Sequence, residues 1–188
     1  MNTVNLVSAA IALAYLLLLA LKATGAMRVL RQRPPSPHSR FDGRGVAILQ
    51  PILGGDPLLA QVLAANLQAL PGAHFHWLLD EADALGRAAA AQLCAQYPDH
   101  PITCLLHPAA PQGINPKTFK LDGVLPRVQE PVVLVLDDDA RLSAAALAQM
   151  LDELPHADLV TALPCYRDDA RFGSRLMAQF VNNNTALT

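Results

Sequence analysis

The sequence has few cysteines and few charged residues, and each shortage excludes a class of protein. Its three cysteines, at positions 94, 104 and 165, form no C-x-x-C pair and are odd in number, which argues against a disulfide scaffold and a cysteine zinc site. Only 16% of the 188 residues are charged, against about 25% in an average soluble chain. Hydrophobic residues make up 52%, so the chain is not disordered throughout.

The apolar excess is concentrated at the N-terminus. Residues 4–21 form an 18-residue run without charge, close to the roughly 20 residues that cross a bilayer as a helix. A cleaved signal peptide needs a basic segment ahead of the run, and no Lys or Arg precedes it here. The sequence therefore predicts a retained transmembrane anchor over residues 1–22.

Charge is distributed unevenly after the anchor. Residues 22–44 carry six basic residues and one acidic residue, whereas residues 45–188 carry eight basic and fifteen acidic ones. Basic flanks stay on the cytoplasmic side, so we expect a single span with the globular part in the cytoplasm. Residues 23–44 are predicted to be a basic, proline-rich linker. Nucleic-acid-binding domains are usually basic, so the acidic globular part predicts no nucleic-acid partner.

From residue 45 onward, short apolar runs alternate with helical patterns. Strands are expected at 46–49, 75–79, 102–106, 132–136 and 159–163, and helices at 57–70, 82–96, from 115 and at 143–154. This alternation predicts an α/β fold with a mostly parallel sheet and helices on both of its faces. Ligands of such sheets bind beyond the carboxyl ends of the strands.

Three consecutive aspartates follow the most strand-like run, VVLVL. On an extended segment Asp137 and Asp139 point to one side and Asp138 to the other. Adjacent carboxylates repel one another unless water or a cation neutralises them. Asp137 and Asp139 are therefore candidate ligands of a hard cation such as Mg²⁺ with diphosphate oxygens; the alternative is a solvated acidic turn.

Two further features lie where strands are expected to end. Asp80, Glu81 and Asp83 follow the second strand, either as site residues or as acids that favour a helix N-terminus. Lys117, in the motif G-I-N-P-K, falls in the first turn of a helix, where a cation is unfavourable unless an anion binds there. The alternative is an ordinary exposed lysine.

His74 and His76 alternate on the second expected strand. Two histidines on one face are potential zinc ligands, but the sequence shows no third ligand. We therefore expect histidines on the surface of the sheet.

The order Q-P-I-L-G-G-D-P, N-L-x-x-L-P, the acidic cluster, G-I-N-P-K, D-D-D-A-R and L-V-T-A-L-P resembles the ceramide glucosyltransferase-like branch of family 2 glycosyltransferases. The resemblance covers about residues 45–185. It implies a GT-A fold that binds a nucleotide sugar, usually the UDP form, behind a membrane anchor. It also implies transfer of the sugar, with inversion, to a lipid hydroxyl such as that of ceramide.

The resemblance implies roles for individual residues. Asp137 and Asp139 match the D-x-D pair that holds Mg²⁺ or Mn²⁺. The remaining matches are to donor-binding positions: Asp83 or, in a shifted register, Asp80; Asn115 and Lys117 in the G-x-N-x-K loop; and Arg141 after the D-x-D.

The sequence departs from the family pattern at three places. Gln50 and Leu53 stand where the family often has lysines, and Lys120 stands where an asparagine is common. The family's general base and its Q/R-x-x-R-W motif come later in its sequences, so no catalytic base is assigned here and residues 45–188 are expected to be the donor-binding portion. A catalytically incomplete nucleotide-sugar-binding fragment and an aspartate-based phosphohydrolase are the alternatives.

The last segment has apolar side chains at helical spacing, including Phe172, Leu176 and Phe180. In the family this region lies by the membrane and the lipid acceptor. A core helix is the alternative interpretation.

Overall fold

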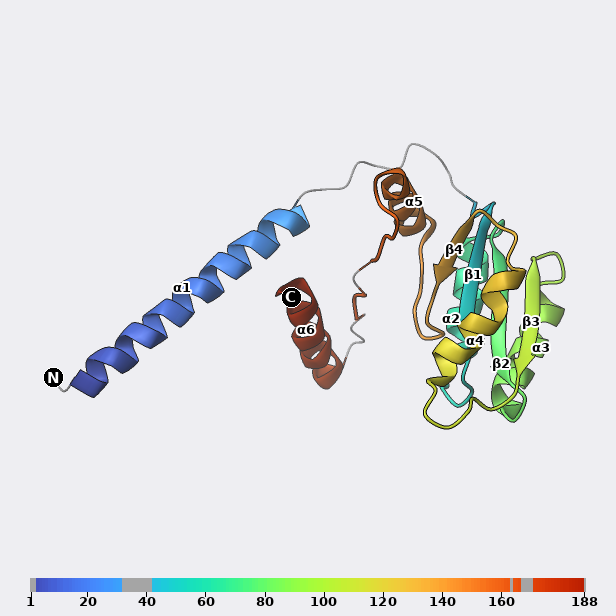
Figure 1. Cartoon of the computed structure of the whole chain (residues 1–188), viewed down its shortest axis with the longest axis horizontal. Helices are drawn as coiled ribbons and strands as arrows, with labels where there is room; N and C mark the ends of the chain where they lie inside the picture. The colour runs from blue at the N-terminus through green and yellow to red at the C-terminus, as the bar shows by residue number, and fades with distance from the viewer. Residues whose placement is uncertain (1–2, 32–41, 163, 167–170, 188) are drawn as a thin grey trace. The chain divides into compact units, whose positions relative to one another are not determined.

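The structure, a computed structural model, describes residues 3–31, 42–162, 164–166 and 171–187 and divides into two units (Figure 1). One unit comprises Met1–Ser36 with Leu159–Thr188, and the other Pro37–Asp158. Residues 32–41 of the predicted linker lie outside the described residues.

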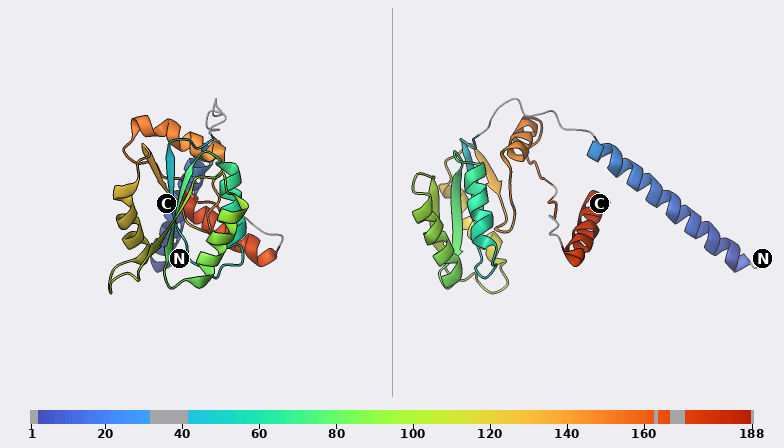
Figure 2. Two further views of the ribbon diagram at one scale, coloured as in Figure 1. Left: turned by 90° about the vertical axis from the view of Figure 1, so that its right-hand side faces the viewer. Right: turned by 180° about the vertical axis from the view of Figure 1, so that it is seen from behind.

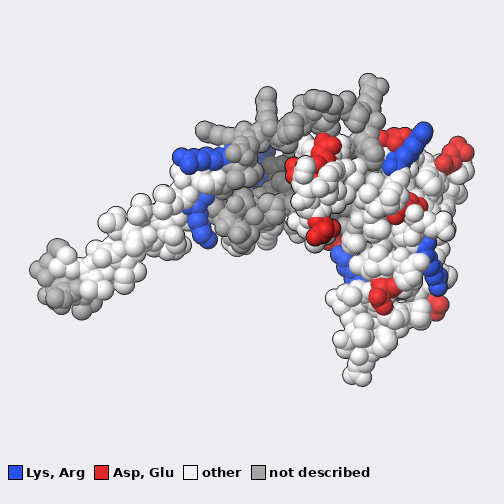
Figure 3. All heavy atoms as spheres, turned by 45° about the horizontal axis from the view of Figure 1, so that its top comes forward, with Lys and Arg blue, Asp and Glu red and all other residues white. Residues whose placement is uncertain are grey.

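Helix α1 (Thr3–Arg31) is the long apolar helix of the first unit. Its segment Leu6–Gly25 is long and apolar enough to cross a membrane, and no part of that segment is buried. In Figure 3 this helix is white along most of its length and carries basic atoms only toward one end. The helix continues beyond the predicted anchor, so residues 23–31 are helical.

Helix α6 (Phe172–Leu187) belongs to the same unit. Its apolar side chains Phe172, Leu176, Met177 and Phe180 are more than half exposed, whereas Ala178 is buried. The predicted apolar side of this helix therefore faces away from any core that the structure describes.

The second unit is built on four parallel strands: β1 (Val46–Pro51), β2 (His74–Asp80), β3 (Ile102–His107) and β4 (Val132–Val135). Their order in the sheet is β3-β2-β1-β4. In β1, Ile48 lies opposite Phe75 of β2 and Leu134 of β4. The central strand β1 is buried from Val46 to Gln50, whereas Val133 and Val135 of the edge strand β4 are more than two-fifths exposed. The four strands confirm the predicted parallel sheet.

Helices cover both faces of the sheet. Figures 1 and 2 show α2 (Leu59–Ala69) and α3 (Ala84–Gln96) on one face and α4 (Pro116–Val124) on the other. The larger core lies on the α2 side, where α5 (Ala144–Glu153) also contributes. A smaller core, formed by Leu49, Leu78 and Val124, lies under α4. Short 3₁₀ helices, η1 (Leu125–Arg127) and η2 (Leu154–His156), follow α4 and α5.

The fifth predicted strand, at 159–163, is wrong for its described part. Residues 159–162 form no strand, and residue 163 lies outside the described residues. Leu159 is 78% exposed, so the start of this apolar run is not buried as a strand of the sheet. A short apolar run predicts burial only where a neighbouring strand supplies backbone partners.

Side-chain caps fix where several helices begin. The Asn115 and Ser143 side chains accept backbone N–H groups of the first turns of α4 and α5, so these two helices begin next to the positions expected from the sequence. The helix expected from residue 57 begins two residues later. The Asp56 carboxylate accepts the Leu58 N–H at 2.7 Å, and α2 begins only at Leu59.

Asp83 caps α3 and also joins that helix to the loop after β1. Its two carboxylate oxygens accept the N–H of Gly54 at 2.6 Å and the N–H of Gly86 at 2.9 Å. A Cβ on Gly54 would lie 2.6 Å from this carboxylate, so only glycine fits there. Although partial burial alone would raise the pKa of Asp83, these hydrogen bonds, with one from Leu85, hold it below its ordinary value.

Two buried amides hold the loop that follows β4. Gln50 Nε2 donates to the carbonyl of Asp137 at 3.2 Å, and Trp77 Nε1 donates to Gln50 Oε1. Asn66 in α2 donates to the carbonyl of Ala140 and accepts the N–H of Leu142, both at 2.9 Å. The loop's backbone is therefore anchored to β1 and α2 from inside the unit.

We expect Asn66→Ala to lower the free energy of unfolding by about 2–3 kcal/mol, because it leaves two backbone groups of the loop unpaired. The exposed Gln68→Ala on the same helix, which loses only a surface hydrogen bond to Tyr97, should change it by at most about 0.5 kcal/mol. Urea unfolding of both variants in detergent measures the difference. Equal losses in the two variants would contradict the anchoring role.

We expect Asp83→Ala to lower the free energy of unfolding by about 1–2 kcal/mol at pH 7, because a helix cap is lost. Asp83→Asn keeps a capping oxygen and should lose less. Because folding lowers the pKa of Asp83, its contribution is complete above the unfolded-state pKa and is lost as pH falls through the folded-state value. The difference in free energy of unfolding between wild type and Asp83→Ala should therefore become smaller below about pH 4. Asp99→Ala, at an exposed position, is the control.

Candidate functional site

A cleft of about 550 Å³ opens beyond the carboxyl ends of β1 and β2. It lies between the loops that follow these strands and the start of α4. Acidic side chains stand beside small and apolar ones in its wall. The lining residues are Leu53, Asp80, Ala82, Asp83, Ala109, Ala110, Ile114 and Pro116.

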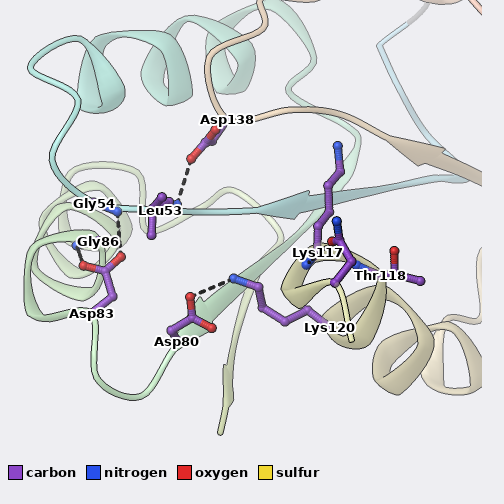
Figure 4. A network of polar contacts seen from close by, with 10 residues as sticks. Leu53, Gly54, Asp80, Asp83, Gly86, Lys117, Thr118, Lys120 and Asp138 are labelled. Carbon is purple, nitrogen blue, oxygen red and sulfur yellow. Dashed lines mark hydrogen bonds and ion pairs between the residues drawn. The ribbon is translucent and has the colours of Figure 1, made fainter. Parts of the chain in front are cut away.

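The strand order places a topological switch point beside this cleft. From β1 the chain proceeds to β2 and β3 on one side, whereas β4 pairs with β1 on the other side. Open parallel sheets bind ligands where the strand order reverses. The loops after β1 and β4 meet there, where Asp138 Oδ2 accepts the N–H of Leu53 at 2.7 Å (Figure 4).

The three consecutive aspartates have different surroundings. Asp137 and Asp139 are exposed and Asp138 is half-buried, so Asp138 differs from its neighbours as predicted. The segment is a turn, closed by the hydrogen bond from Ala140 N–H to the Asp137 carbonyl, and not the extended chain that the prediction assumed. Nothing in the sequence predicted the hydrogen bond between Asp138 and Leu53.

Negative charge is crowded in this turn. Burial raises the pKa of Asp138, and repulsion from Asp139 and Asp137 raises it further, against the hydrogen bond from Leu53. Mutual repulsion of this kind is relieved when a cation binds among the carboxylates. Exposed carboxylate oxygens suit hard divalent ions such as Mg²⁺ and Mn²⁺. The donor set of Asp137 and Asp139 therefore fits the predicted metal.

Lys117 extends from the first turn of α4 to the acidic turn. Its ammonium group pairs with the carboxylate of Asp137, which brings two of the predicted site residues together. The backbone of this helix start is already satisfied, because Asn115 Oδ1 accepts the N–H groups of Lys117 and Thr118 and the Asn115 carbonyl accepts that of Phe119. Any anion attraction here therefore comes from the ammonium group and not from free N–H groups.

Asp80 forms a partly buried ion pair with Lys120 (Figure 4). The Lys120 Nζ to Asp80 Oδ2 distance is 3.0 Å, and Lys120 is only 4% exposed. A buried ammonium group needs such a partner. Burial and the charge of Lys120 also lower the pKa of the nearby His107. Sequence analysis noted Lys120 as a departure from a family pattern but did not predict this pair.

Arg141 is not joined to the other candidates by a side-chain contact. Its side chain is exposed, and its guanidinium forms no ion pair or hydrogen bond with the described residues. The structure thus gathers Asp80, Asp83, Asn115, Lys117 and the acidic turn around the cleft and the switch point, without joining Arg141 to them.

The histidine pair differs from its prediction. His76 is buried rather than on the surface, and Glu130, from the segment before β4, reaches both rings. The sequence offered no signal for this third residue, because it lies more than fifty positions away along the chain. Only the order of the strands in the sheet brings Glu130 to the two histidines.

One similar solved structure is the mannosyltransferase PcManGT from Pyrobaculum calidifontis in complex with GDP-Man and Mn²⁺. It shares 19% sequence identity with this chain at a TM-score of 0.52, over 72% of this chain and 39% of that one. The chain thus spans about two-fifths of the length of that neighbour. No curated protein matched the sequence. The second unit has a GT-A-like fold, as the resemblance implied.

The family comparison covers nearly the whole chain. The model of glycosyl transferase family 21 matches residues 4–187, so the match includes α1 and α6 as well as the sheet. The resemblance was to the ceramide glucosyltransferase-like branch of family 2, so the family number differs from the one predicted. The glycosyltransferase assignment is confirmed, and the chain belongs to glycosyl transferase family 21.

Proposed function

We propose that this chain carries the donor and metal site of a membrane-anchored glycosyltransferase that transfers a sugar from a nucleoside diphosphate sugar to a lipid hydroxyl. One observation supports it most strongly. An acidic turn, a lysine and a 550 Å³ cleft converge at the carboxyl ends of the parallel strands. This is where such sheets bind nucleotides.

Asp137 and Asp139 are proposed to hold Mg²⁺ or Mn²⁺. Such an ion, when bound, neutralises diphosphate charge and acts as a Lewis acid for departure of the nucleoside diphosphate. Asp138 is unsuited to that role because it is committed to Leu53. The amides of Gln50 and Asn66 hold the backbone on either side of the turn, which keeps both exposed carboxylates in place.

Lys117 and Asn115 are proposed to orient the diphosphate. Asn115 fixes the first turn of α4 by capping it. Lys117 extends from that turn to Asp137, so its ammonium group is within reach of an anion beside this carboxylate. The arrangement gives a reason for a cation at a helix start, where the helix dipole disfavours one.

The cleft is proposed to take the nucleoside. Asp80 and Asp83 both line it. The two carboxylate oxygens of Asp83 accept the N–H groups of Gly54 and Gly86. Each oxygen has a second lone pair, which can accept a hydrogen bond from a hydroxyl or N–H group of the nucleotide sugar. Arg141 is proposed as an exposed residue that contacts the donor from outside the cleft. We assign no general base within this chain.

Two helices of the first unit support the proposal of a lipid acceptor. One is α1, an apolar helix of membrane-spanning length. The other is α6, whose exposed Phe172, Leu176 and Phe180 share one side. Basic residues Lys22 and Arg28 at the end of α1 favour a cytoplasmic globular part. Helices with these apolar surfaces suit a lipid acceptor better than a water-soluble one.

We expect UDP or GDP to bind the full-length chain in detergent only with Mn²⁺ or Mg²⁺ present. Asp137→Ala and Asp139→Ala should each weaken this binding at least tenfold, because a metal ligand is lost. The exposed Asp99→Ala should bind as wild type does. Isothermal titration with each nucleotide, with and without metal, makes the measurement and identifies the base.

Two results would contradict the donor-site proposal. One is nucleotide binding that is independent of metal; the other is binding that survives both aspartate variants unchanged. Metal-dependent binding without sugar transfer to lipid would instead favour the alternative of a catalytically incomplete nucleotide-sugar-binding fragment.

We expect the chain to remain in membranes after an alkaline wash. Leu13→Asp combined with Leu17→Asp should release it, because each charge costs about 2.5–3.5 kcal/mol near the centre of a membrane helix. Leu58→Asp, at an exposed site of the second unit, is the matched control. The exposed thiol of Cys165 should react with an impermeant reagent only after cell lysis; reaction in intact cells would overturn the cytoplasmic orientation.

A further inference from the structure

We propose a zinc site formed by His74, His76 and Glu130, at the end of the sheet opposite the donor cleft. The two imidazoles come from the start of β2, and the carboxylate comes from the segment that leads into β4. One potential ligand atom from each side chain lies within 4.8 Å of the others. This site is independent of the proposed glycosyltransfer function.

The spacing of the groups is close to that of a zinc coordination shell. Tetrahedral ligands with bonds of about 2.0–2.1 Å lie about 3.4 Å apart. His76 Nε2 lies 3.9 Å from Glu130 Oε2, and His74 Nδ1 lies 2.5 Å from Glu130 Oε1. The two distances end on different oxygens of Glu130, and shifts of about 1 Å would place both nitrogens and one of these oxygens around one ion.

The burial of His76 is the second observation that indicates a ligand. Its side chain is 7% exposed, and neither ring nitrogen has a hydrogen-bond partner among the described residues. Buried polar groups are normally paired, and an unpaired one is costly.

The surrounding structure orients the first histidine. His74 Nε2 lies 2.8 Å from Thr103 Oγ1 on β3. His74 Nδ1 forms a hydrogen bond with Glu130 Oε1. A metal ion bound to Nδ1 would take the place of the proton between these two atoms, and Nε2 would then carry the ring proton and donate it to the hydroxyl. A metal-bound histidine normally donates its second N–H in this way.

The ligand types select the ion. Two imidazoles and one carboxylate with an open fourth position form a set that binds Zn²⁺. Mg²⁺ and Mn²⁺ prefer all-oxygen sites such as the one proposed at Asp137 and Asp139. With β2 spanning seven residues from His74 to Asp80, the two sites are about 20 Å apart, so each can be tested without the other.

We expect the full-length chain, purified in detergent without an oligohistidine tag and treated with chelator, to bind one Zn²⁺ per chain in competition with a chromophoric zinc indicator. Glu130→Gln and His74→Ala should each weaken this binding at least tenfold, and Thr103→Val should weaken it about tenfold. Glu153→Gln and His156→Ala, both exposed and outside the cluster, are the matched controls. Asp137→Ala should bind Zn²⁺ as wild type does.

A second measurement keeps the proposal falsifiable if a buried variant fails to fold. Co²⁺ in place of Zn²⁺ should give the visible absorption of a tetrahedral site in wild type, and this absorption should be absent in Glu130→Gln, whose fold is checked by circular dichroism. Absence of stoichiometric Zn²⁺ binding, or binding that is equal in wild type, Glu130→Gln and His74→Ala, would overturn the site and leave a hydrogen-bonded ion pair.

Discussion

The pairing of β1 with β2 on one side and β4 on the other positions the polar groups of both proposed sites. Because β1 is buried on both faces, its neighbours and the helices that cover it have little freedom. The order β3-β2-β1-β4 brings residues near 53, 80 and 137 to one end of the sheet. It brings His74 and Glu130 together at the other end. A single register therefore underlies both the donor site and the zinc site that we propose.

Three buried polar side chains show how the unit stabilises a loop without regular structure. Gln50, Asn66 and Lys120 are each at most 4% exposed, and each has a partner. Two of them hold the backbone of the acidic turn, and the third pairs with Asp80 in the cleft wall. Such groups are costly to bury alone, so they are informative about which parts of the site need a fixed geometry.

The sequence predicted the four parallel strands, the starts of α4 and α5 and the long apolar helix α1, because each depends on local periodicity or local sequence chemistry. It also placed Asp137, Asp139 and Lys117 where strands and helices end, and the sheet brings these ends together. It did not predict that Asp138 binds the Leu53 N–H or that Glu130 meets the histidines, since both contacts join distant segments. The expected strand at 159–163 was wrong because apolar composition does not supply a pairing partner.

The exposed edge strand has a consequence for handling the protein. β4 is only four residues long, and its outward valines are incompletely covered. An edge of this kind offers unpaired backbone groups to another strand, so self-association in solution would not depend on the membrane helix alone. Detergent that shields α1 leaves this edge accessible, and a charged residue at Val133 or Val135 would be the change that keeps preparations monodisperse.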